Sequence, residues 1–154
     1  MPQLVKGGKH AFGWSPVGDD GEVALPPDAL KEYGFSEVQE VILMPGSRTS
    51  GGFVVVAQDA LQASRLGGFL KGVLEPGGLS GAEGVVYRAG GRVFYRIMLR
   101  GGRMRIPLET LERFGVKAGD KLLAVRGSGL GLALVVRGPI VREAGKHREL
   151  AVFE

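Results

Sequence analysis

Apolar and polar residues alternate most clearly between residues 92 and 100. Val93, Tyr95, Ile97 and Leu99 occupy every second position, and Arg92, Phe94, Arg96, Met98 and Arg100 lie between them. A period of two predicts a strand with one buried face. Gly101-Gly102 then predicts a tight hairpin turn, after which a second strand runs to Pro107. This register places Leu99 opposite Met104 and Ile97 opposite Ile106 on the inner face. It also places Arg100 opposite Arg103 on the outer face.

The periodicity changes after Pro107. Leu108, Leu111 and Phe114 mark one face of a short helix, and Gly115 ends it. Residues 120–126 and 130–137 then predict a closing pair of strands around the turn Gly127-Ser128-Gly129.

The same order of elements occurs earlier in the chain, 81 residues upstream. The segment Gly21-Glu22-Val23-Ala24-Leu25-Pro26 matches Gly102-Arg103-Met104-Arg105-Ile106-Pro107. An ungapped register continues to Phe53-Val54-Val55, which falls on Leu134-Val135-Val136. The first copy therefore predicts a strand over 10–17, a turn at Asp20-Gly21, a helix over 27–33, and strands over 39–44 and 53–57. Trp14 falls on Tyr95, which favours a place in the core over an exposed stacking role.

The repeat divides the chain into four parts. Residues 10–57 and 91–138 are the two repeats, residues 58–90 form a partly helical segment and linker, and residues 139–154 form a basic, mobile C-terminal tail. We predict a mainly β fold in which both repeats build one swapped-hairpin or double-psi-like barrel. The alternative is two half-barrels that pair between chains.

The repeated unit resembles the AbrB/SpoVT/MazE family of swapped-hairpin domains. The resemblance rests on the segment 102–107 with its Ile-Pro ending, on Leu111, on Phe114-Gly115-Val116, on Ala118-Gly119-Asp120-Lys121 and on the closing strands, which together cover the whole unit. In that family two units interleave their hairpins, usually across a homodimer. Here both units lie in one chain, so the resemblance implies an intramolecular pseudo-dimer.

Family members commonly bind duplex DNA through basic residues of the first hairpin and the adjoining helix. At the matching positions the second repeat carries Arg96, Arg100, Arg103 and Arg105 on the hairpin and Arg113 on the helix. Arginines directly opposite each other on neighbouring strands destabilise a hairpin by about 0.2–1 kcal/mol, which is easier to explain if a polyanion neutralises them. A solvated basic face is the alternative.

The first repeat departs from this pattern. Asp19 and Glu22 stand where the second repeat has Arg100 and Arg103, and Asp20 lies in the turn, so phosphates are repelled there. Three interpretations remain open: the second repeat alone binds DNA, the acidic hairpin docks on a basic hairpin, or DNA binding has been lost. Docking between chains would build a homo-oligomer.

The distribution of charge supports the contrast between the repeats. Residues 1–56 carry four basic and seven acidic residues, residues 57–90 carry three of each, and residues 91–154 carry thirteen basic and six acidic residues. The chain has no cysteine and two histidines, His10 and His147, which excludes thiolate zinc sites and disulfides. With no apolar run of about 20 residues, we expect a cytoplasmic protein without membrane contact, metal or small-molecule cofactor.

Other motifs are weaker. The sequence Gly127-Ser128-Gly129-Leu130-Gly131 resembles a phosphate-binding loop but lacks its spacing and lysine, which favours a hairpin turn. Asp19, Asp20 and Glu22 favour a solvated turn over a cation site. We therefore expect a non-enzymatic, AbrB-like DNA-binding transcriptional regulator. The alternative is an antitoxin-like or scaffolding interaction module that has lost DNA binding. An enzyme ranks third, since no base lies near Ser47 or Ser128 in the sequence.

Overall fold

The computed structural model describes residues 10–46, 49–57, 86–89, 92–126 and 131–154. Most of the predicted helical segment and linker, 58–90, and most of the turn at 127–131 therefore lie outside the described residues. Residues 86–89 of that segment are described and form a strand rather than a helix or linker. The elements are β1 (Ala11–Pro16), β2 (Glu22–Ala24), α1 (Pro27–Glu32), β3 (Val38–Pro45), β4 (Phe53–Ala57), β5 (Val86–Ala89), β6 (Arg92–Arg100), β7 (Arg103–Arg105), α5 (Leu108–Arg113), β8 (Lys121–Arg126), β9 (Leu132–Val135), α6 (Pro139–Ala144) and β10 (Ala151–Val152).

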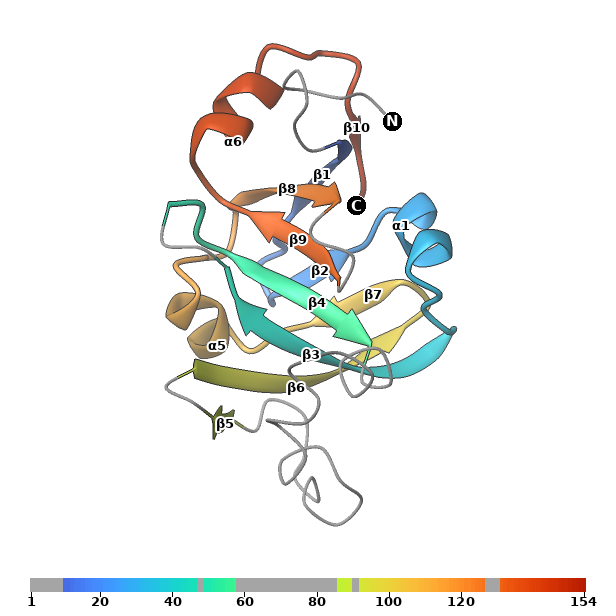
Figure 1. Ribbon diagram of the computed structural model, residues 1–154, viewed down its shortest axis with the longest axis vertical. Coiled ribbons are helices and arrows are strands. Elements are labelled where there is room, and N and C mark those ends of the chain that lie inside the picture. The colour runs from blue at the N-terminus through green and yellow to red at the C-terminus, as the bar shows by residue number, and fades with distance from the viewer. Residues whose placement is uncertain (1–9, 47–48, 58–85, 90–91, 127–130) are drawn as a thin grey trace.

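The described strands form one curled, barrel-like sheet, which confirms the mainly β class (Figure 1). Its strand order is β10-β1-β8-β9-β4-β3-β6-β7-β2, with β5 added beside β6. The strands β1 and β2, near the two ends of this path, are consecutive in the chain, and the turn between them is closed by a hydrogen bond from Gly18 N to Glu22 O of 2.9 Å. In Figure 1, helix α1 lies to the right of the sheet and helix α5 to its left.

The strand pairings join the two repeats reciprocally. Strand β1 of the first repeat pairs with β8 of the second, and β6 of the second repeat pairs with β3 of the first. The short strands β2 and β7 pair with each other, as do β4 and β9. Neither repeat therefore completes the sheet from its own strands.

Residues that occupy the same structural position in the two repeats, called counterparts from here on, can be identified from these contacts. From residue 21 to residue 44 the offset is 81: helices α1 and α5 begin and end 81 residues apart. The hydrogen bond from Leu25 N to Gly102 O, 2.8 Å, is repeated between Ile106 N and Gly21 O, 3.0 Å. Val23 and Met104, themselves counterparts, lie opposite each other at the centre of the β2·β7 pair. The predicted repeat register is confirmed over this range.

The ungapped register was wrong beyond the third strand of each repeat. Pro45 lies opposite Phe53 and Arg126 opposite Leu132, so the turn has seven residues in the first repeat and five in the second. The shorter turn makes Leu132, not Leu134, the counterpart of Phe53. Val54 and Ala133 then become counterparts, and they lie opposite each other at the centre of the β4·β9 pair.

The register of the first strand also differs from the prediction. Trp14 lies opposite Leu123 and Arg96 opposite Ile42, and these two partners are 81 residues apart. Trp14 is therefore the counterpart of Arg96 and not of Tyr95. Gly18 pairs with Glu22, so the turn into β2 has three residues, 19–21, rather than two, which moves β1 by one position. A bulge between Ala11 and Gly13 moves the start of β1 again.

Two apolar clusters lie on the two faces of the sheet. The inner cluster takes side chains from both repeats, and at its centre the ring of Phe114 lies 5.1 Å from Tyr95 and 5.4 Å from Phe53. The outer cluster lies on β8 and β9, where Leu123, Val125 and Val135 pack with Ala144 of α6 and with Leu150. Residues 139–154, predicted as a mobile tail, instead form α6 and β10, and β10 pairs in parallel with β1.

Candidate nucleic-acid interface

The predicted arginines of the second repeat lie at the hairpin of β6 and β7. Arg100 lies opposite Arg103, as the sequence predicted, and this is the β6·β7 register pair found in the described strands. Met104 and Ile106 are buried, so Arg103 and Arg105 point away from the core and are exposed. Together with Arg100 they line one shallow hollow on the outside of the sheet.

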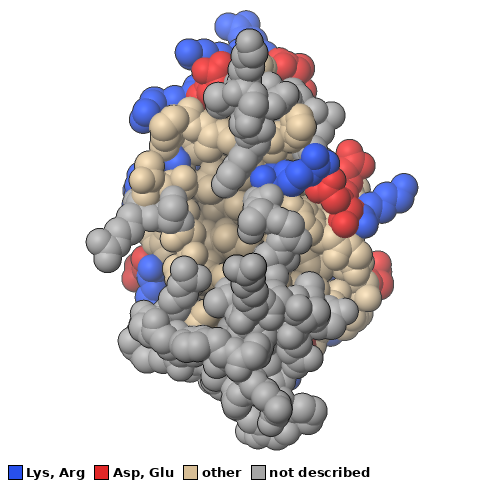
Figure 2. All heavy atoms as spheres, viewed as in Figure 1, with Lys and Arg blue, Asp and Glu red and all other residues tan. Residues whose placement is uncertain are grey.

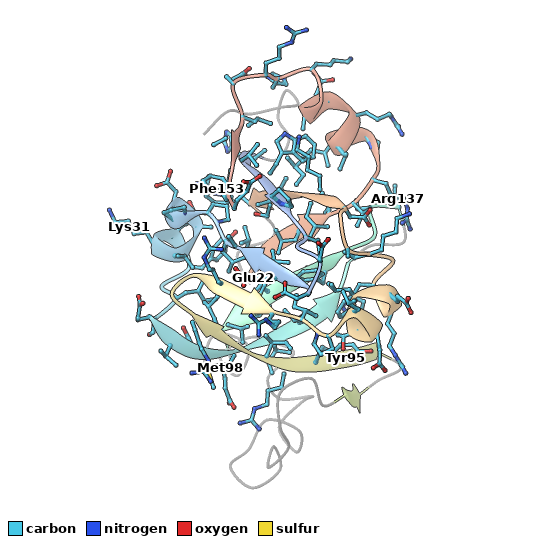
Figure 3. The ribbon with its side chains drawn as sticks, turned by 180° about the vertical axis from the view of Figure 1, so that it is seen from behind. Glu22, Lys31, Tyr95, Met98, Arg137 and Phe153 are labelled. Atoms are coloured by element: carbon cyan, nitrogen blue, oxygen red, sulfur yellow. The ribbon has the colours of Figure 1, made fainter. Side chains whose placement is uncertain are left out.

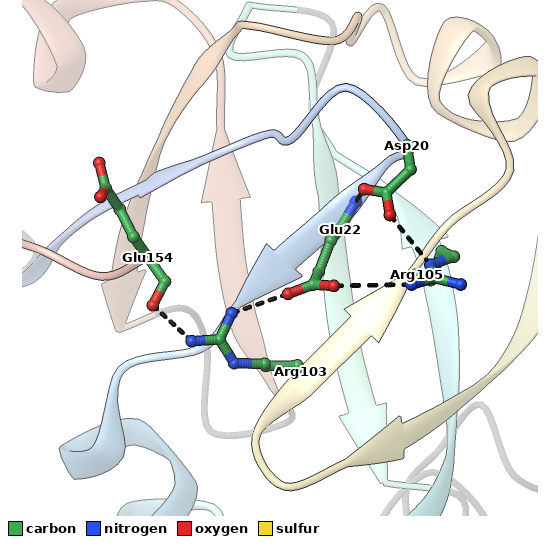
Figure 4. A network of polar contacts seen from close by, with 5 residues as sticks. All are labelled: Asp20, Glu22, Arg103, Arg105 and Glu154. Carbon is green, nitrogen blue, oxygen red and sulfur yellow. Dashed lines mark hydrogen bonds and ion pairs between the residues drawn. The ribbon is translucent and has the colours of Figure 1, made fainter.

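Carboxylates of the first repeat occupy this surface. The pairing of β2 with β7 sets Glu22 opposite Arg105, near the centre of the face in Figure 3. Arg103 Nη1 donates to Glu22 Oε1 at 2.7 Å, and Arg105 Nη2 lies 3.9 Å from Glu22 Oε2. Arg105 Nε lies 3.2 Å from Asp20 Oδ2 (Figure 4). One glutamate therefore lies between two of the predicted DNA-binding arginines.

The C-terminal segment adds a further acceptor. Arg103 Nη2 donates to the main-chain oxygen of Glu154 at 2.6 Å, and Phe153 N donates to Trp14 O at 2.8 Å. The Arg103 side chain is half exposed, so each of its contacts is worth no more than a surface ion pair, about 0–1 kcal/mol. A polyanion must nevertheless displace these acceptors before it can bind Arg103.

The remaining predicted residues differ in their surroundings. Arg96 forms an ion pair with Glu40 on the neighbouring strand β3, and its side chain is 19% exposed. Arg113 ends α5, is exposed, and has no ion pair among the described residues. It does not line the hollow that Arg100, Arg103 and Arg105 share. The structure therefore brings three of the five predicted arginines together and leaves two apart.

The sequence analysis missed two further contacts between the repeats. Arg126 of β8 binds both carboxylate oxygens of Glu32 at the end of α1, and its Nη1 lies 3.4 Å from His10 Nδ1. The hydrogen bond with Glu32 raises the pKa of Arg126. Lys121 Nζ lies 4.9 Å from the ring centroid of the half-buried Trp14. Both contacts join residues far apart in the chain, so they became visible only once the strand pairing was known.

Comparisons with protein-family models, with curated proteins and with solved structures find no match to this chain. The candidate site therefore depends on its own geometry.

Metal binding, membrane spanning and acid–base catalysis have little support in the described residues. In the described ranges, no group of three or more histidine and carboxylate side chains is placed to hold a metal. None of the helices that the structure describes has the length and apolarity to cross a membrane. A hollow beside α1 contains Asp28 and Glu149 among apolar residues. The backbone N–H of Glu149 and the side chain of His147 lower the pKa of Glu149, which makes it a weaker base.

Charged side chains also gather at the opposite end of the molecule. Figure 2 shows basic and acidic side chains close together at the top, over α6 and the residues that follow it. There Lys146 and His147 lie 3.4 and 3.7 Å from the carboxylate of Glu143. These contacts lie within one short segment, so they differ from the pairs that join the repeats.

Proposed function

We propose that this chain is a single-chain relative of the AbrB/SpoVT swapped-hairpin domains, with its repeats related by an approximate two-fold axis. The reciprocal pairings β1·β8 and β3·β6 support this architecture, because each repeat gives its first strand to the other repeat. The axis would pass between Val23 and Met104 at one side of the barrel and between Val54 and Ala133 at the other.

The function we propose is binding of duplex DNA through the second repeat alone, as a transcriptional regulator. The observation that supports it is the hollow lined by Arg100, Arg103 and Arg105, three guanidinium groups directed outward from one hairpin. Guanidinium groups bind phosphate oxygens with paired hydrogen bonds. Arg113, on the helix that follows the hairpin, would add a contact at the edge of the interface.

The surrounding carboxylates set an expectation for affinity. Asp20 and Glu22 already neutralise Arg103 and Arg105, so fewer counterions are released when DNA binds there. We expect weak binding with a shallow dependence on salt. Neutral variants Asp20→Asn and Glu22→Gln together should raise affinity and steepen that dependence.

The test is a salt series with mixed-sequence duplex DNA and the full chain. For the wild type, the logarithm of affinity should fall with the logarithm of salt with a slope of about −0.9 per phosphate contact. The variant Arg100→Ser/Arg113→Ser should lose affinity and reduce the slope by about two contacts' worth. The matched control is Arg142→Ser/Arg148→Ser, which removes the same charge from two exposed positions near α6.

A second function has an observation in its favour. The ion pairs of Glu22 with Arg103 and Arg105 leave the hairpin face close to neutral, as expected for a protein-interaction module that does not bind DNA. In that case the wild type shows no binding even at about 50 mM salt, and the two arginine variants behave alike. Loss of affinity in both arginine variants to the same extent would also contradict a specific hairpin interface.

A further inference from the structure

Ion pairs between the repeats follow a single rule of sign. Each of the five ion-pair contacts that the structure describes between them takes its acid from the first repeat and its base from the second. The bases are Arg96, Arg103, Arg105 and Arg126, and the acids are Asp20, Glu22, Glu32 and Glu40. Binding of DNA by one hairpin does not require this division, since it extends to β3, β8 and α1.

Three of the four acids in these ion pairs have a basic residue at the counterpart position. Glu22, Glu32 and Glu40 of the first repeat correspond to Arg103, Arg113 and Lys121 of the second. In an assembly of two identical repeats, the contact between Glu22 and Arg103 would join two like charges. Two first repeats would place two glutamates diagonally across this sheet pair, and two second repeats would place arginines there, where like charges repel.

The contacts of the first strands follow the same rule. Arg96 pairs with Glu40, and the counterparts of these two residues are Trp14 and Lys121, which form the cation–π contact. Two second repeats would bring Arg96 against Lys121. Two first repeats would bring the Glu40 carboxylate against the face of Trp14, which attracts cations and repels anions.

The contact between Arg126 and Glu32 completes the comparison. Their counterparts are Pro45 and Arg113. Two second repeats would set Arg126 against Arg113, and two first repeats would leave Glu32 beside Pro45 without its base. At each of these positions the pairing of unlike repeats is favourable, and the pairing of like repeats is repulsive or loses the contact.

We propose that these charges are a pairing code: a first repeat accepts a second repeat as its partner and rejects another first repeat. Within one chain the code selects the closed barrel. Between chains it allows one partner, the opposite repeat of a second copy of this chain. The acidic hairpin then serves to specify assembly.

The experiment uses the full chain with single reversals Glu22→Arg and Arg103→Glu, and the double reversal Glu22→Arg/Arg103→Glu. Each single reversal places like charges across β2 and β7, so its urea midpoint should fall. The double reversal restores the contact between positions 22 and 103 but leaves a like charge opposite Arg105, so it should recover part of the loss at low salt and less at high salt. The control Glu112→Arg makes the same charge change at an exposed position with no ion pair among the described residues and should leave the midpoint nearly unchanged.

Co-refolding tests partner choice directly. Glu22→Arg and Arg103→Glu are mismatched within their own chains but matched to each other, so an equimolar mixture should give a 1:1 heterodimer by native mass spectrometry. Each variant refolded alone, and the mixture of either with the double reversal, should give less of it. If a single variant fails to fold alone, rescue by its complement supports the code. Additive losses in the double reversal, or a mixture without enriched heterodimer, would overturn the proposal.

Discussion

At the scale of single residues, two glycines show where backbone conformation limits the sequence. Gly21 ends the turn into β2 with φ of 84°, and a Cβ atom there would collide with the carbonyl oxygen of Ile106. The same carbonyl lies beside the hydrogen bond from Ile106 N to Gly21 O, 3.0 Å, which joins the repeats. Gly34, after α1, has φ of 67° but nothing within 4 Å of a Cβ. A side chain at Gly34 would meet only the strain of a positive φ, whereas a side chain at Gly21 would meet that strain and a steric clash as well.

We predict that Gly21→Ala destabilises the protein more than Gly34→Ala. Gly34→Ala should cost about 1–2 kcal/mol, the price of a left-handed conformation for an alanine. Gly21→Ala should exceed it, because the alanine also displaces the backbone of Ile106. Urea denaturation of both variants measures the difference. Equal decreases in the free energy of unfolding would show that the backbone of Ile106 can move away from the alanine without a measurable energetic penalty.

Sequence reasoning worked well where a residue's role is set by its neighbours in the chain. The alternation over 92–100, the Gly101-Gly102 turn and the prolines before both helices predicted their elements because these signals act locally. Trp14 shows the limit. The face on which it lies depends on how many residues the turn before β2 contains, and that number leaves no mark in the hydrophobic pattern.

At the scale of elements, α6 shields part of the outer face of the sheet from solvent. It lies over the outer face of β8 and β9, where Ala144 is 1% exposed and packs with Leu123, Val125 and Val135. The inner cluster contains none of the α6 residues. The barrel core and this outer layer therefore use different faces of the same strands.

We predict that Ala144→Asp loosens α6 without opening the barrel. A carboxylate buried without a partner costs several kcal/mol, and the helix can move away to avoid that cost. Hydrogen exchange should accelerate in α6 and β10, while the amides of β3 and β6 keep their protection. Arg142→Ala, two positions earlier on the exposed side of the helix, is the control. Faster exchange throughout the sheet would instead make α6 part of the core.

The candidate site could be predicted only in part from sequence, for a reason that belongs to the element scale. The sequence located the five arginines and recognised that Glu22 opposes their charge. Which arginine meets which carboxylate depends on the pairing of β2 with β7. That pairing brings Glu22 into contact with Arg103, 81 residues away in the chain. A long-range pairing of two three-residue strands has no local signal, so the ion pairs at the hairpin became visible only in the fold.

At the scale of the whole molecule, the reciprocal pairing couples the two repeats. Each sheet contact of β1 with β8 or of β3 with β6 joins residues of different repeats that are at least 52 positions apart in the chain, and the inner cluster mixes side chains of both repeats. A repeat that separates from its partner leaves its first strand and half of the core in water. Partial unfolding by repeats is therefore as costly as complete unfolding.

We predict one cooperative transition for both repeats. Trp14 is the only tryptophan, and it lies on a strand of the first repeat against the outer cluster of the second. Its fluorescence in urea should therefore change at the same midpoint as far-ultraviolet circular dichroism, which reports strands of both repeats. Because these contacts join residues far apart in the chain, refolding should take milliseconds to seconds rather than microseconds. Two separated midpoints would show that each repeat folds alone, and the pairing between repeats would then be a docking of finished units rather than a shared sheet.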